Sequence, residues 1–174
     1  MGRIMALDVG DVRIGIAVSD LMGIIANPLE TYTRRGNLDS DAAYIAKLAQ
    51  EKEVSLIISG LPLGLKGQEN DQTTKTREFV DKLREVCDIP IEYLDERFTT
   101  MSAERVLIEG NVRRENRKKV IDKVAATIIL QNYLDRKRYF LEVELWLTRK
   151  NNTTVVATTN TTYTNTIATA AAKT

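Results

Sequence analysis

Met5-Ala6-Leu7-Asp8-Val9-Gly10-Asp11-Val12-Arg13-Ile14-Gly15-Ile16-Ala17-Val18-Ser19 contains two short apolar runs with Gly10-Asp11 between them. Branched apolar residues favour strands, and a Gly-Asp pair is typical of a tight hairpin turn. The sequence therefore predicts a β-hairpin over about residues 3–19, with Asp8 at the end of its first strand. A carboxylate among apolar neighbours is costly unless a cation compensates it, which makes Asp8 a candidate metal or phosphate-site residue. The alternative is an Asp that caps the turn by accepting hydrogen bonds from nearby amides.

The composition excludes several kinds of catalytic site. The chain has 174 residues, enough for one domain, with no histidine and one cysteine, Cys87. This excludes Ser-His and Cys-His catalysis, Cys/His zinc sites and intramolecular disulfides. Cys87 ends an amphipathic stretch and is expected in the core. Hydrolysis would have to use carboxylates, lysines or metal-activated water, and a bound metal is the strongest of these options.

Charge and hydropathy give two further expectations. The formal net charge is +1, so the chain is not a basic nucleic-acid coat, although local basic clusters still bind phosphate. No apolar run approaches the roughly 20 residues that span a bilayer, and the N-terminus lacks the pattern of a signal peptide. We therefore expect a cytoplasmic protein that does not associate with membranes.

Residues 26–137 alternate between short apolar runs and segments with helical periodicity. Antiparallel strands followed by alternating helices and strands predict an α/β fold, a mixed sheet with helices on both faces. The alternation after residue 37 indicates right-handed crossovers and parallel pairing. The predicted strands are 29–32, 54–59 and 89–94, and the predicted helices are 37–52, 71–86, 101–109 and 121–137.

The last part of the chain differs in composition. Residues from 151 onward are mostly Thr, Asn and Ala, with almost no charge and no helical stripe. Residues 140–147 alternate between apolar and polar as a strand does. We predict a domain over 1–137 and an atypical Thr/Asn-rich tail over 138–174 that is disordered, weakly β-prone or loosely attached.

Other acidic residues occupy positions comparable to that of Asp8. Asp95 and Glu96 end a predicted strand, and because side chains alternate along a strand only one of them can share a face with Asp8. Asp122 lies in the first turn of the last predicted helix, where an acid also complements the helix dipole. A basic run over 113–119 precedes it, which by itself is typical of a solvated loop. Cations beside a carboxylate suit a site that holds phosphate and metal together.

Four segments together resemble the bacterial YqgF/RuvX family, ribonuclease H-like proteins described as Holliday junction resolvases and pre-16S rRNA nucleases. The resemblance covers about residues 1–137, so the tail departs from it. It implies a five-stranded mixed sheet whose first three strands are antiparallel. It also implies a catalytic and metal-binding triad of Asp8, Glu96 and Asp122 that takes Mg²⁺ or Mn²⁺. The segments are Asp8-Val9-Gly10-x-Val12-Arg13-Ile14-Gly15, Gly60-Leu61-Pro62-Leu63-x-x-x-Gly67, Asp95-Glu96-Arg97-Phe98-Thr99-Thr100 and Asp122-Lys123-Val124-Ala125-Ala126-x-Ile128-Ile129-Leu130.

The resemblance implies a metal-dependent nuclease acting on structured nucleic acid, foremost at the 5′ end of pre-16S rRNA. A Holliday junction resolvase is the alternative, and a non-catalytic, transcription-associated nucleic-acid-binding module is an alternative of another class. An ATPase of the sugar-kinase or actin type would need a second related domain, for which the chain is too short. Monomer and homodimer both stay open, as do the number of metals and a fourth acidic ligand. The residues expected to contact phosphate are Arg13, Arg97, Arg114, Arg117, Lys118 and Lys119.

Overall fold

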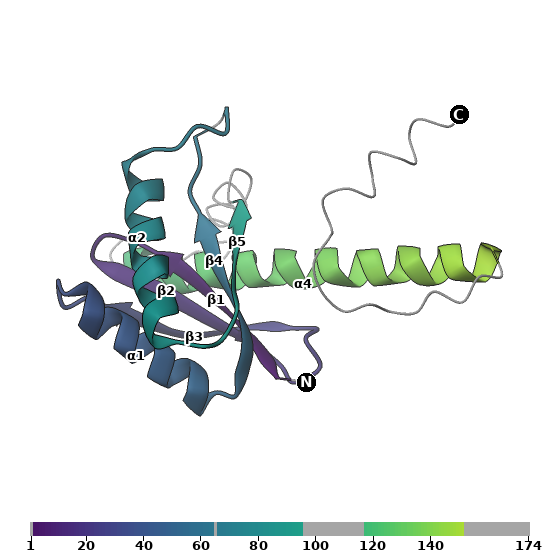
Figure 1. Cartoon of the computed structure of the whole chain (residues 1–174), viewed down its shortest axis with the longest axis horizontal. Helices are drawn as coiled ribbons and strands as arrows, with labels where there is room; N and C mark the ends of the chain where they lie inside the picture. The colour runs from purple at the N-terminus through teal and green to yellow at the C-terminus, as the bar shows by residue number, and fades with distance from the viewer. Residues whose placement is uncertain (1, 65, 96–116, 152–174) are drawn as a thin grey trace. The chain divides into compact units, whose positions relative to one another are not determined.

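The central sheet contains five strands in the order β3-β2-β1-β4-β5 (Figure 1). The computed structural model describes residues 2–64, 66–95 and 117–151, without the side chains of 117–123 and 149–151. β1 pairs antiparallel with β2, and β2 with β3, whereas β1–β4 and β4–β5 are parallel. This confirms the predicted five-stranded mixed sheet with three antiparallel strands first. The strands are β1 Arg3–Val9, β2 Arg13–Ser19, β3 Ala26–Thr33, β4 Val54–Leu61 and β5 Ile91–Asp95.

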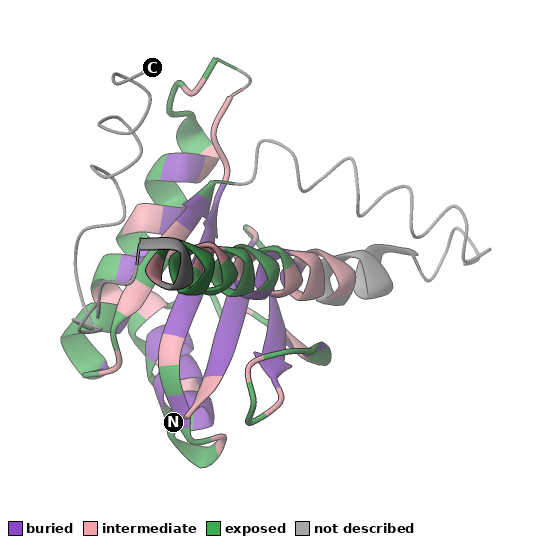
Figure 2. Cartoon of the chain, turned by 90° about the vertical axis from the view of Figure 1, so that its right-hand side faces the viewer, coloured by how far each residue is buried: buried purple, intermediate pink, exposed green. Residues whose placement is uncertain are grey.

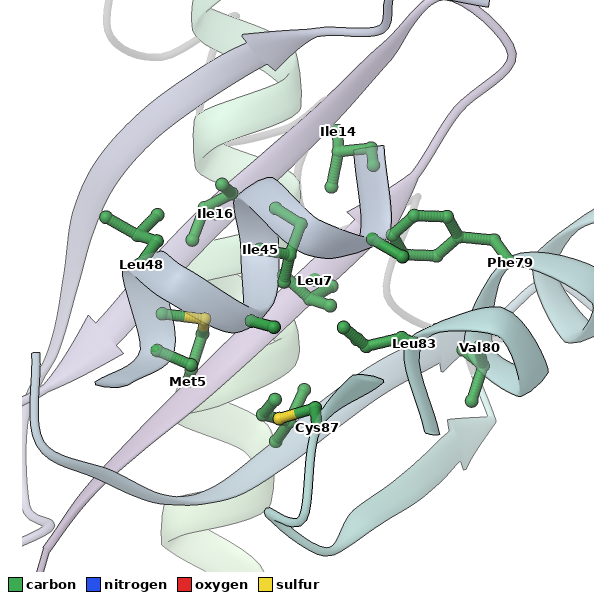
Figure 3. Packing of buried hydrophobic residues seen from close by; sticks show 14 of the residues in the cluster. Met5, Leu7, Ile14, Ile16, Ile45, Leu48, Phe79, Val80, Leu83 and Cys87 are labelled. Carbon is green, nitrogen blue, oxygen red and sulfur yellow. The ribbon is translucent and has the colours of Figure 1, made fainter. Parts of the chain in front are cut away.

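Helices α1 (Leu38–Glu51) and α2 (Asp71–Val86) cover one face of the sheet (Figure 1). The side chain of Asn37 caps α1, and Asn70 forms a capping box with Thr73 at the start of α2. Figure 3 shows the core on this face, which we call the first core, with side chains of both helices over those of β1 and β2. Its largest fully buried members are Phe79, Met5, Leu7, Ile14, Ile16, Ile45, Ile57, Leu83 and Val80.

Helix α4 (Arg117–Asn151) covers the opposite face over its described N-terminal part (Figure 1). Its Ala126, Ile129, Leu130 and Leu134 pack against alternate residues of the central strands and form the second core. Side chains alternate between faces along a strand, so Met5 and Leu7 belong to the first core and their neighbours Ile4 and Ala6 to the second. The central strands are therefore buried on both sides, as the purple ribbon of Figure 2 shows.

Most predicted elements agree with the structure, and the differences lie at their ends. Helix 71–86 has the predicted bounds, whereas the strands predicted at 29–32 and 54–59 are longer, and the one predicted at 89–94 begins at Ile91. The helix predicted over 101–109 lies outside the described residues. Because α4 begins at Arg117, Asp122 is not in its first turn, so the prediction of a helix-terminal acid is wrong.

The structure divides into two units, Met1–Arg138 and Tyr139–Thr174. In the second unit, residues 139–151 are helical, so the strand predicted over 140–147 is wrong. Between 111 and 151 the sequence has no Gly or Pro to interrupt a helix, and Leu and Glu are good helix formers. The apolar–polar alternation over residues 140–147 is weaker evidence for a strand than the uninterrupted run of helix-forming residues is for a helix. None of the helices described is both long and apolar enough to cross a membrane.

Two leucines of α4 give a direct test of the second core. Leu130 is fully buried, whereas Leu141 is 49% exposed. We expect Leu130→Ala to lower the free energy of unfolding by about 2–5 kcal/mol through lost burial and the cavity left behind. The matched Leu141→Ala variant should change it by less than about 0.5 kcal/mol. Urea unfolding measures both, and equal effects would contradict the packing described here.

Candidate metal and nucleic-acid site

The carboxyl ends of β1, β4 and β5 meet at one edge of the sheet. The three strands are parallel neighbours, and Leu61 at the end of β4 is in register with Asp95 at the end of β5. Asp8 is the last residue but one of β1, and two strand spacings, about 10 Å, separate β1 from β5. Ligands of open α/β sheets bind beyond the carboxyl ends of the strands. The edge next to Asp8 is therefore the candidate site.

Asp8 lies on the sheet face that α4 covers. It is two residues after Ala6 of the second core, so the two side chains are on the same face, and Asp8 is only partly buried. Its partner across the antiparallel ladder is Gly15, which has no side chain to fill the space beside the carboxylate. Arg13, at the start of β2 and partly buried, is on the same face as Gly15 and Ala17. A carboxylate and a cation thus share one face at the end of the hairpin.

Asp95 faces the other way. Its neighbour Leu94 belongs to the second core, whereas Tyr93 packs against the first core. By alternation Asp95, which is exposed, is on the α1/α2 face, opposite to that of Asp8. The next residue, Glu96, lies outside the described residues, as do Arg97 and Arg114.

Helix α4 carries the other predicted site positions. Ala126, Leu130 and Leu134 follow one another at intervals of four residues and pack against the sheet face on which Asp8 lies. Position 122 is one turn before Ala126 in this register. Arg117, Lys118 and Lys119 lie in the first turn of α4, and their side chains, like that of Asp122, are outside the description. Among the side chains that are described, no three acidic, His or Cys residues form a metal-binding group.

The β1–β2 turn is closed by a hydrogen bond from the Gly10 amide to the Arg13 carbonyl, at 2.9 Å. A Cβ atom at position 10 would lie 2.8 Å from that same carbonyl oxygen. Gly10 is not among the described residues with positive φ. The turn therefore needs glycine because the backbone approaches closely, and not because of a left-handed conformation.

Residues from outside the hairpin donate to the backbone carbonyls of this turn. The guanidinium of Arg34 donates from Nη1 to Gly10 at 3.1 Å, and its backbone amide donates to Val12 at 2.9 Å. The side-chain amide of Gln72 donates from Nε2 to Val9 at 2.8 Å. We call these three hydrogen bonds the turn contacts.

Arg34 is itself held by a buried carboxylate. Asp41 of α1 is fully buried and accepts from Arg34 Nε at 3.1 Å, from the Tyr32 hydroxyl at 2.9 Å and from the Arg35 amide at 3.0 Å. Burial alone would raise the pKa of Asp41, but these donors and the positive charge of Arg34 hold that pKa below its ordinary value. The carboxylate is therefore charged at neutral pH and fully hydrogen-bonded.

Sequence reasoning missed Arg34, Asp41 and Gln72. Asp41 left a usable signal, because it lies on the apolar face of α1, four residues before Ile45. A charged residue on such a face needs a partner, which the basic pair before α1 supplies. Gln72 left no signal, since its acceptor is 63 residues away in the sequence.

Comparison with known proteins identifies the family of the chain. A family model described as "RuvX: Holliday junction resolvase" matches residues 2–136. The chain belongs to the RuvX family. A Fusobacterium nucleatum relative is 46% identical over 140 residues, which cover 79% of this chain and 100% of that protein. A relative from Thermoanaerobacter pseudethanolicus is 50% identical over 137 residues, 78% of this chain and 98% of that protein. Both are named "Putative pre-16S rRNA nuclease".

A solved structure supports the fold of this RuvX-family chain. Thermus thermophilus RuvC in complex with a Holliday junction substrate aligns with a TM-score of 0.51 at 11% identity, over 74% of this chain and 92% of that chain. At this identity the likeness concerns the fold alone, and it agrees with the predicted ribonuclease H-like sheet. By its family and its relatives the chain is a nuclease, a hydrolase of phosphodiester bonds.

The close approach at Gly10 gives one prediction. Gly10→Ala should lower the free energy of unfolding by about 1–3 kcal/mol, because the new methyl group forces the turn to open. The neighbouring Asp11→Ala variant loses only the exposed ion pair with Lys75 and should be nearly neutral. Thermal and urea unfolding of both variants measure the difference, and a neutral Gly10→Ala would show that the turn accommodates a side chain.

The buried carboxylate gives a prediction about pH. At neutral pH, Asp41→Asn should lower the free energy of unfolding by about 2–3 kcal/mol, since it weakens charged hydrogen bonds. Because the folded pKa of Asp41 is below the ordinary 3.8, this difference is fully present above pH 3.8 and is lost as the pH falls through the folded pKa. Urea unfolding of both proteins across that range tests it. A difference that stays constant in acid would contradict a charged Asp41.

Proposed function

We propose that this protein is a metal-dependent nuclease that matures the 5′ end of pre-16S rRNA in the cytoplasm. The observation that carries the proposal is the position of Asp8, partly buried at the carboxyl end of the central strand β1 and on one face with Arg13. The names of the relatives supply the substrate.

The proposed metal ligands are Asp8, Glu96 and Asp122. Asp95 is on the face opposite to Asp8, which favours Glu96 as the member of the acidic pair that joins it. The register of α4, with position 122 one turn before Ala126, favours Asp122 as the third. Carboxylate oxygens suit hard divalent ions such as Mg²⁺ or Mn²⁺. The chain has no histidine, and its one cysteine, Cys87, is in the first core, on the sheet face opposite to that of Asp8.

In phosphodiester hydrolysis the carboxylates would hold the metal ion and Arg13 would bind the phosphate. When bound, a divalent ion supplies Lewis-acid stabilisation of phosphate charge and lowers the pKa of water. The three carboxylates would hold the ion and fix its position against the sheet edge. Arg13, next to Asp8 on the same face, would orient a phosphate by charge-assisted hydrogen bonds.

Basic residues around this edge would bind the nucleic-acid backbone. Contacts between phosphate and Arg or Lys give affinity without reading the sequence, and each one adds to the salt dependence of binding. With a net charge of +1, the protein would bind over a short footprint. The proposed contacts are Arg13, Arg97, Arg114, Arg117, Lys118 and Lys119.

Cleavage of a four-way DNA junction is the second candidate function. The matching family is described as a Holliday junction resolvase, and the aligned RuvC was solved with a junction substrate. Resolution requires two cuts placed symmetrically, and therefore two copies of the site, so a dimer in solution would favour this substrate.

Asp8→Asn tests the proposed function. The amide keeps the size of the side chain but removes its charge, so we expect cleavage of a 5′-extended 16S rRNA precursor with Mg²⁺ to fall at least about 100-fold. Substituting even a residue that only hydrogen-bonds a metal ligand commonly lowers metal affinity or activity about 10- to 100-fold. The same assay on a four-way junction shows which substrate is preferred.

The matched control is Asp88→Asn, an exposed aspartate that precedes β5 at the opposite edge of the sheet. It should cleave at the wild-type rate. Undiminished cleavage by Asp8→Asn would exclude the proposed site. Binding of RNA without any metal-dependent cleavage by the wild type would favour a non-catalytic binding module instead.

A further inference from the structure

The backbone that carries Asp8 has less support from the sheet than the rest of β1. The parallel ladder between β1 and β4 runs from Arg3 only as far as the pair Leu7–Ser59. Asp8 and Val9 continue to pair with β2, opposite Gly15 and Ile14. The end of the strand is therefore held by a ladder on one side only, at the point where the proposed chemistry needs a fixed carboxylate.

The turn contacts supply the missing support. Gln72 donates to the carbonyl of Val9, directly after Asp8, and Arg34 donates to that of Gly10, one residue further on. These bonds connect the turn to α2 and to the β3–α1 junction, across 63 and 24 residues of sequence. The hairpin already closes itself through the bond from Gly10 to Arg13, so the outer bonds are not needed to form it.

Arg34 is unusually well fixed for a residue that contacts a surface turn. Its side chain is only 13% exposed and pairs with the fully buried Asp41. Its guanidinium also lies over the Phe79 ring of α2, 5.5 Å from the ring centre. Replacing a buried ion pair by packed apolar residues is often neutral for stability, so the pair is better explained by the geometry that it fixes. Here that geometry aims one N–H group at the turn.

We propose that Arg34 and Gln72 are positioning residues, which fix the turn backbone and thereby the Asp8 carboxylate for catalysis. Asp41 acts through Arg34. The inference rests on the proposed role of Asp8. Val9 is in the first core whereas Asp8 is on the opposite face, so these residues reach the turn from the side away from Asp8. They act through the backbone and do not contact substrate.

Two variants separate positioning from stability. Gln72→Leu removes one turn contact and leaves the Arg34–Asp41 pair intact, with Gln50→Leu as its matched control on the exposed end of α1. Arg34→Met alone leaves Asp41 buried and uncompensated and risks unfolding. The double variant Arg34→Met with Asp41→Asn removes both charges and should recover much of the lost stability.

The measurements are kcat and KM for the rRNA precursor, thermal unfolding, and hydrogen exchange of the Gly10 amide. Gln72→Leu and the double variant should lower kcat about 10- to 100-fold with KM nearly unchanged, because a remote substitution that misplaces a catalytic group by about 1 Å can cost about 100-fold. Exchange of the Gly10 amide should become faster in both. Gln72→Lys, which can again donate to Val9, should regain part of kcat.

The outcomes distinguish this inference from the proposed function. Wild-type kcat in both variants, together with a loss on Asp8→Asn, overturns the positioning role and leaves the nuclease site intact. No difference between the wild type and Asp8→Asn overturns the nuclease site and the catalytic part of this inference with it. Unchanged exchange at Gly10 in both variants overturns the claim that Arg34 and Gln72 hold the turn.

Discussion

The structure depends on β1 being hydrogen-bonded on both edges and covered on both faces. Its side chains alternate between two cores, and β2 and β4 flank it. A carboxylate in the middle of such a strand would lose its hydration without compensation. Asp8 lies near the end of the strand, beyond the last pair of the ladder with β4, and is only partly buried, so its carboxylate keeps contact with solvent.

This constraint creates a second requirement. A strand end that leaves one ladder early is also less fixed, and a group that binds a metal must be held within a fraction of an ångström. Long polar side chains that donate to backbone carbonyls meet the requirement without placing further charge in the site. Arg34 can do so because Asp41, Tyr32 and Phe79 determine where its guanidinium lies.

The sequence predicted the parts of the fold that local patterns determine. The hairpin, α2 and the parallel pairing of β4 and β5 follow from apolar runs, helical periodicity and the alternation of helices with strands. For the site, alternation along the strands already required that Asp95 and Glu96 lie on different faces, and the structure places Asp95 away from Asp8. The helical state of 140–147 was mispredicted because helix propensity and continuity outweigh a short alternation, and the start of α4 because it lies in a basic run that is typical of a solvated loop. The contacts of Arg34 and Gln72 join distant segments, and no local pattern encodes such pairs.

The two faces of the sheet carry different kinds of polar group, and the reason is solvent access. On the α1/α2 face, polar groups around the turn are satisfied by the protein itself, and Asp41 has no exposed surface. On the α4 face, Asp8 and Arg13 are partly exposed at the strand ends, where a solvated ligand can reach them. A charge buried among its own donors gives rigidity but cannot exchange ligands, whereas a partly exposed charge can bind and release them. A site on this strand that binds and releases ligands in every catalytic cycle requires both, a rigid backbone held from the α1/α2 face and accessible charged groups on the α4 face.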